Sequence, residues 1–243
     1  MGLFDVFKKS APPSVEVVDE ALRRQLMQFI LKAVTSEDNR IRVEDALNTA
    51  ATIVAERCID TAGDYPLREH DLTPGSRVLS TAVNRLVCGD VADGGVGSVP
   101  RNTIIGILRA RLDPALFLDS EFPALRDVFS YYAAHVGNAA DWGKVPLSVD
   151  PNHHPFVPPL RIGYETRRTV DEILKPATSD KMRCLRIATE SLADILKMVA
   201  GAIDHKLALT LTIETINGMA KTAPMTEKAM KAAAQQQDGK KDP

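Results

Sequence analysis

Aromatic residues are scarce in this chain of 243 residues, where Phe, Trp and Tyr together make up only 5%. Hydrophobic residues nevertheless reach 44%, so a core has to be built mainly from Leu, Ile, Val and Ala side chains. Such side chains suit helices that approach one another closely. The formal net charge of -2 gives the chain no general electrostatic attraction for nucleic acids or for anionic lipids.

Cysteine is also rare, and no long hydrophobic run is present. Cys58, Cys88 and Cys184 are far apart and form no CxxC pair, which predicts buried thiols in a reducing compartment rather than disulfides. No segment reaches the roughly 20 uninterrupted apolar residues of a membrane-spanning helix. The first residues lack the basic and then apolar order of a secretory signal. We therefore expect a soluble, cytoplasmic protein.

The known signatures of catalysis are missing as well. The sequence has no Gly-x-Ser-x-Gly elbow, no HExxH zinc motif and no Gly-Lys-Ser/Thr after its glycine-rich run at 94–98. Adjacent carboxylates such as those of Glu44 and Asp45 fall at expected helix starts, where they favour the helix dipole. We expect no cofactor, and enzymatic activity is left open with a preference against it.

Helical periodicity is what the sequence does contain. Apolar residues recur at steps of three and four, which is typical of amphipathic helices. The pattern predicts helices over 14–33, 42–61, 76–88, 100–112, 114–118, 123–136 and 179–203, with a short charged segment at 166–175. Residues 206–220 fit a strand or a helix. Because an isolated strand leaves its backbone groups unpaired, we expect a helix there.

Five prolines between Lys144 and Arg161 interrupt this pattern and surround an Asn-His-His triplet. A long irregular connection in a compact domain is usually a functional loop or a linker. The sequence thus predicts a mainly α, multi-helix bundle-like domain with a long proline-rich irregular arm. We divide it into a flexible N-terminal segment (1–13), a helical block (14–137), the arm (138–165), a C-terminal helical block (166–223), and a short helix with a disordered tail (224–243).

The arm suggests a function as a non-catalytic, protein-binding subunit or adaptor of a larger cytoplasmic assembly. Extended proline-rich chain loses little entropy on docking, and Trp, Tyr and Arg dominate many interfaces. Aromatic anchoring of the arm to the helical body is the alternative explanation for the same residues. We predict that other protein subunits bind here, and that a homo-oligomer forms through residues 179–220. The candidate protein-binding residues are Trp142, Phe156, Arg161, Tyr164, Arg167 and Arg168.

Two other functions stay open at this point. One is a hydrolase or metal-dependent enzyme whose site lies where the arm meets the first block, with His70, His135, His153 and His154 as its ionisable or metal-binding groups. The other is a peripheral membrane protein, in which Leu3, Phe4 and Phe7 make a weak membrane contact next to two lysines. Nucleic-acid binding is not expected, because the local basic excess near the arm comes with a single aromatic residue.

Overall fold

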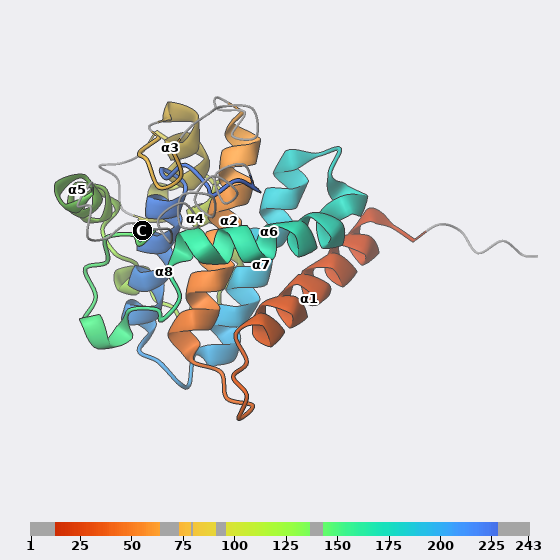
Figure 1. Cartoon of the computed structure of the whole chain (residues 1–243), viewed down its shortest axis with the longest axis horizontal. Helices are drawn as coiled ribbons and strands as arrows, with labels where there is room; N and C mark the ends of the chain where they lie inside the picture. Colours follow the sequence, from red (N-terminus) through yellow and green to blue (C-terminus); the bar gives the residue numbers. More distant parts are fainter. Residues whose placement is uncertain (1–12, 64–72, 79, 91–95, 137–142, 228–243) are drawn as a thin grey trace, which may run out of the picture.

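The computed structural model describes residues 13–63, 73–78, 80–90, 96–136 and 143–227. These ranges are mainly helical, as the sequence predicts, and the ambiguous segment 206–220 is helical too (Figure 1). The helices within them are α1 (Val15–Ala33), α2 (Val43–Ala62), α3 (Thr81–Cys88), α4 (Ile104–Arg111), α5 (Leu125–His135), α6 (Pro159–Leu174), α7 (Lys181–Val199) and α8 (His205–Met219).

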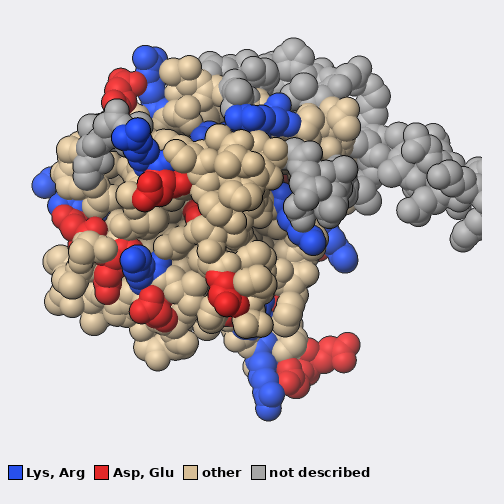
Figure 2. Space-filling model, turned by 90° about the vertical axis from the view of Figure 1, so that its left-hand side faces the viewer, with Lys and Arg blue, Asp and Glu red and all other residues tan. Residues whose placement is uncertain are grey.

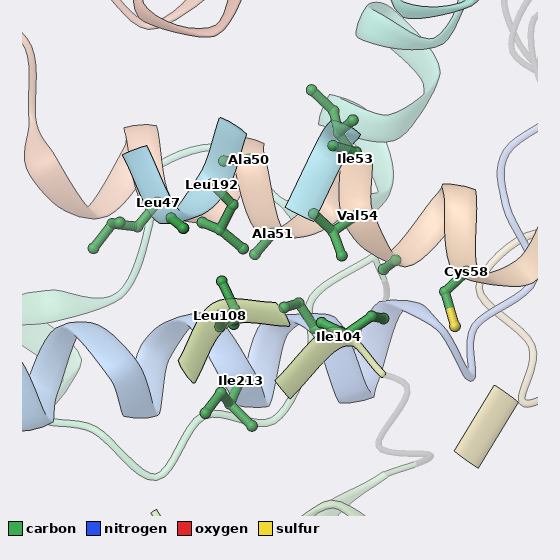
Figure 3. Packing of buried hydrophobic residues seen from close by; sticks show 14 of the residues in the cluster. Leu47, Ala50, Ala51, Ile53, Val54, Cys58, Ile104, Leu108, Leu192 and Ile213 are labelled. Atoms are coloured by element: carbon green, nitrogen blue, oxygen red, sulfur yellow. The ribbon is translucent and has the colours of Figure 1, made fainter. Parts of the chain in front are cut away.

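Helix α2 lies at the centre of the molecule, and its residues from Asp45 to Ile59 are all buried. It packs most closely against α7, α8 and α6, the last of which crosses over it in Figure 1. Small side chains permit this close approach. Figure 3 shows Ala50 and Ala51 of α2 beside Leu192 from α7, with Leu108 from α4 on the other side. Buried residues from both predicted helical blocks belong to one hydrophobic cluster.

Helices α1 and α7 are joined by ion pairs along their length. Asp19 accepts hydrogen bonds from Arg183 and Arg186, both at 2.7 Å. One turn further along α1, Arg23 Nε lies 2.6 Å from an oxygen of Asp194. The partners follow the same order on both helices, so α1 and α7 run parallel. Helix α1 packs chiefly against α7, and less extensively against α2, which follows it in the sequence.

The irregular arm is shorter than the sequence suggests. We expected it to extend to residue 165, but α6 begins at Pro159 and includes most of the predicted short charged segment at 166–175. Proline is well suited to the first helical position, because it has no N–H to leave unpaired and its φ is already helical. The pair Pro158 and Pro159 therefore ends the arm and starts a helix.

Two further helix boundaries and one expected helix differ from the sequence-based expectation. Helices α3 and α4 begin later than predicted, after Ser80 and Thr103, whose hydroxyls accept hydrogen bonds from Val83 N and Gly106 N at 3.2 and 3.1 Å. These N-cap contacts fix the helix starts. Residues 114–118 form turns rather than a helix.

The surface carries charges of both signs. Figure 2 shows the side of the molecule on which α5 and α8 lie in Figure 1, and acidic and basic side chains alternate there with wide neutral areas. None of the helices in the described residues combines the length and the apolar character needed to cross a bilayer.

The contact between α8 and the arm depends on Gly218, and this gives a prediction. A Cβ at Gly218 would lie 2.7 Å from Cβ of Val145, which is too close for real side chains. We expect Gly218→Ala to lower the free energy of unfolding by about 1–3 kcal/mol, as overpacking does. Urea denaturation measures this. Gly201 is the matched control, because nothing lies within 4 Å of its Cβ position. Equal effects of Gly218→Ala and Gly201→Ala would contradict the close contact.

Candidate functional site

The described part of the arm, residues 143–158, is irregular except for one 3₁₀ turn at Pro151–His153, so most of its backbone groups need partners other than helical hydrogen bonds. Helices on both sides supply them. On the side of α8, Glu214 accepts hydrogen bonds from the backbone N–H of Ser148 at 2.7 Å and from its hydroxyl at 2.5 Å. The hydroxyl of Tyr131 in α5 donates to the carbonyl oxygen of Leu147 at 3.1 Å. The pKa of Glu214 is raised because burial disfavours its charged form.

The start of α2 holds the other end of the arm. The guanidinium of Arg42 donates to the carbonyl oxygens of His154 and Asn152 at 2.6 and 2.7 Å. Asp45 Oδ1 accepts from the backbone N–H of Phe156 at 2.8 Å. The arm is therefore fixed by side chains more than 100 residues away in the sequence.

Phe156 points away from this well-anchored backbone. Its side chain is 78% exposed, the most exposed large hydrophobic residue in the described part of the chain. The guanidinium of Arg42 lies against the ring in a cation–π contact, with its central carbon 4.1 Å from the ring centroid. A shallow pocket of about 130 Å³ lies beside the ring, between Lys144, Leu147 and Pro158. The exposed ring is the feature expected of an interface anchor.

A larger groove of about 310 Å³ opens beside the arm at Val157, between α1, α2 and α6. Its lining is mostly apolar, and it includes two carboxylates. The lining residues are Phe29, Ala33, Val34, Thr35, Asp45, Thr49, Val157, Ile162, Glu165 and Thr166. We call this the α1–α6 groove. Burial is the main influence on Asp45, and it raises the pKa of that carboxyl.

The arginine and tyrosine residues that we predicted to bind a partner differ in how exposed they are. Arg161 and Arg168 are exposed on α6 and accessible to a partner. Arg167 instead points inward, where it binds Glu56 Oε1 at 2.6 Å and the carbonyl oxygen of Met225 at 2.7 Å. Glu56 is buried, and burial raises its pKa even though the charge of Arg167 opposes that shift. Tyr164, also on α6, is half-buried against the core.

The described histidines of the enzyme hypothesis each have a different local partner. His153 Nδ1 lies 2.8 Å from Glu44 Oε1, and His154 Nε2 lies 3.0 Å from the carbonyl oxygen of Val149. His135 Nδ1 lies 2.8 Å from the carbonyl oxygen of Tyr131, on which its ring also stacks. Within the ranges that the structure describes, no three His, Cys, Asp or Glu residues come together as metal ligands.

Several predicted residues lie outside the described ranges. These are His70 of the enzyme hypothesis, Trp142 of the protein-binding hypothesis, and Leu3, Phe4 and Phe7 of the membrane hypothesis.

Sequence reasoning missed Lys221, which follows α8 and is only 6% exposed. Its ammonium donates to Asn217 Oδ1 at 2.5 Å and lies 4.3 Å from the ring centroid of Phe129. Burial lowers the pKa of Lys221 to about 8, and the charge of Arg77 acts in the same direction. In the sequence, the only local indication that Lys221 could be buried is Asn217, which lies one helical turn earlier and accepts its hydrogen bond.

Comparison of the chain with protein-family models, curated proteins and solved structures gave no match, so its function has to be inferred from this geometry.

The anchoring of the arm by Arg42 can be tested by Arg42→Ala. We expect faster hydrogen exchange of the backbone amides at 152–156 and a loss of about 1–3 kcal/mol in the free energy of unfolding, because two charge-assisted hydrogen bonds disappear. Arg161→Ala is the matched control. Its ion pair with Glu165 on the same helix is exposed and screened by water, so its loss should change the free energy of unfolding little. Unchanged exchange in Arg42→Ala would show that other contacts hold the arm.

Lys221 gives a prediction about pH. Its folded pKa is about 8, below the ordinary value of 10.5, so between these pH values the unfolded chain binds more protons. The free energy of unfolding attributable to Lys221 therefore rises as pH increases from 8 to 10.5, by about 3 kcal/mol. Urea denaturation of the wild type and Lys221→Met at both pH values measures this difference. Burial is the main influence on the thiols of Cys58 and Cys88, and it raises their pKa values in both proteins, so most of their titration cancels. The smaller effect of the Lys221 charge on these thiols is lost in Lys221→Met and acts in addition. A difference independent of pH would contradict the lowered pKa.

Proposed function

We propose that this protein is a protein-binding subunit of a larger assembly, and that it contacts its partner through the arm. The contact surface, which we call the arm surface, consists of Phe156 with the neighbouring Pro155, Pro158 and Lys144. The observation that supports this proposal is the exposed ring of Phe156 on a backbone fixed by α2 and α8.

The anchoring of the arm favours binding, because the conformational entropy of the arm is already lost when the protein folds. A loop that becomes ordered only on binding loses conformational entropy at that moment, which weakens the complex. Here the backbone around Phe156 is already fixed by Asp45 and Arg42. Complete burial of a Phe side chain contributes about 1.5–3 kcal/mol, and most of that surface is still available on Phe156.

Arg42 acts as a support for Phe156 rather than as a contact for the partner. Two of its nitrogens donate to carbonyl oxygens of the arm, and Nε lies 3.4 Å from Glu44. Its guanidinium is therefore occupied within the protein. The partner should offer an apolar pocket for the ring, with polar groups at the rim that match the ammonium of Lys144.

A homo-oligomer remains a prediction, but α7 and α8 are poor candidates for its interface. Most of their apolar residues are buried in the core of the same chain, mainly against α2, and only Met182 and Met198 of α7 are exposed large hydrophobic residues on these two helices. The arm surface carries the more exposed apolar group and is the better candidate for contact with any protein partner.

The test of this function is Phe156→Ala. Loss of the ring should weaken partner binding about 10- to 150-fold, which corresponds to the burial energy of a Phe side chain. The measurement is quantitative mass spectrometry of proteins that are cross-linked to the tagged chain in its own cells. Partners should also cross-link directly to a benzophenone amino acid placed at position 156.

Leu118→Ala is the matched control, because Leu118 is 51% exposed and lies on a different surface, beside α4. Both variants should keep the thermal stability of the wild type. If Phe156→Ala retains every cross-linked protein at the wild-type ratio, the arm surface is not the binding site.

A further inference from the structure

The α1–α6 groove lies directly beside the arm surface. Val157, the residue after Phe156, forms part of the groove wall, so a partner that covers the ring also reaches the groove. The opposite walls come from Phe29 at the end of α1 and Ile162 on α6. A volume of about 310 Å³ accommodates one long side chain and is at the lower end of the range for ligand sites.

The charges in the groove have one sign. Asp45 and Glu165 are its only charged lining residues in the described part of the chain, and both are acidic. Arg161 pairs with Glu165 at 2.6 Å but is not part of the lining. Arg42 lies 3.7 Å from Asp45 Oδ1, but its nitrogens are directed at arm carbonyls and Glu44. An anion in the groove would therefore meet two carboxylates, whereas a cation would be attracted.

Two polar groups at the groove can accept further hydrogen bonds. The contacts of Asp45 with Phe156 and Arg42 both go to Oδ1, and Oδ2 has no hydrogen bond among the described residues. Thr49 is only 1% exposed, and its hydroxyl likewise has no hydrogen-bond partner in the described part of the structure. Buried polar groups are normally paired, and the Thr49 hydroxyl is buried without a partner in the described part of the structure. Together with the free carboxylate oxygen of Asp45, it points to an occupant that carries hydrogen-bond donors.

We infer that the α1–α6 groove receives a basic side chain of the protein partner, a Lys or an Arg next to apolar residues. The aliphatic stem packs against Phe29 and Ile162, and the ammonium or guanidinium group donates to Asp45 at the floor and to Glu165 at the rim. This inference rests on the proposed function, because it assigns the groove to the same partner that covers Phe156.

The chemistry of the groove is tested first with small probes that do not require the partner. Phenethylamine carries an ammonium on an apolar stem, 2-phenylethanol has a similar body without charge, and 3-phenylpropionate has the opposite charge. Titration followed by residue-resolved ¹⁵N–¹H NMR should show shifts centred on Ala33, Thr49 and Ile162 for the amine. We expect the amine to bind about tenfold or more tightly than the other two, since a charge-assisted hydrogen bond is lost without the ammonium.

Two variants separate the loss of the groove's binding chemistry from a disturbance of the fold. Asp45→Asn should abolish the preference for the amine, but it also weakens the contact with Phe156 N. Ala33→Phe therefore provides a second variant. Ala33 is exposed at the rim, so a large ring there blocks the groove without disturbing Asp45. Ala33→Ser leaves the groove open and is the matched control. The inference is overturned if the propionate binds as well as the amine, or if Ala33→Phe leaves amine binding unchanged.

The cross-linking assay separates this inference from the proposed function. A benzophenone amino acid at the exposed position 32, next to the rim, should capture a partner peptide that contains Lys or Arg beside apolar residues. A captured peptide without a basic residue would overturn the inference. Partner loss in Phe156→Ala together with full retention in Ala33→Phe would overturn it too, but would leave the proposed function standing. Full retention in Phe156→Ala would remove the function and the inference together.

Discussion

A helix that is surrounded by other helices has no side that faces water, and this constraint on α2 organises the rest of the structure. Its residues from Asp45 to Ile59 are buried, yet they include carboxylates, an amide and a guanidinium. Buried polar groups without partners are costly, so each has to find a hydrogen bond inside the protein. Asp45 binds the arm, Glu56 binds Arg167 on α6, and Arg57 binds Asp171 on the same helix at 2.8 Å.

The arm is thus positioned by the same helix that forms the core. Gly163 of α6 leaves room for Glu56, because a Cβ there would lie 2.5 Å from Oε1. With α6 held at this distance, Pro159 fixes where the helix begins and where the arm has to end. A disturbance in the polar contacts of α2 would therefore be transmitted to Phe156. This coupling explains why an irregular segment can present a defined surface.

The helices could be predicted from the sequence because their signal is local: apolar residues at steps of three and four need no knowledge of the fold. The candidate site could be predicted only in part. Phe156 stood out by its proline neighbours, but its backbone is held by Arg42 and Asp45, more than 100 residues away. Arg167 looks like any exposed arginine in the sequence, and only the packing of α6 on α2 turns it toward Glu56. The buried position of Lys221 also depends on distant helices.

Two explanations were open for the aromatic residues near the arm, and anchoring of the arm or packing on the core accounts for only some of them. Tyr131 anchors the arm through its hydroxyl, and Tyr164 packs half-buried against the core, so both support the chain. Phe156 does neither, although aromatic side chains are scarce in this protein. Polar contacts fix the arm without requiring the ring, because the hydrogen bonds from Arg42 and to Asp45 already orient its backbone. The ring is therefore left available for a surface outside the chain.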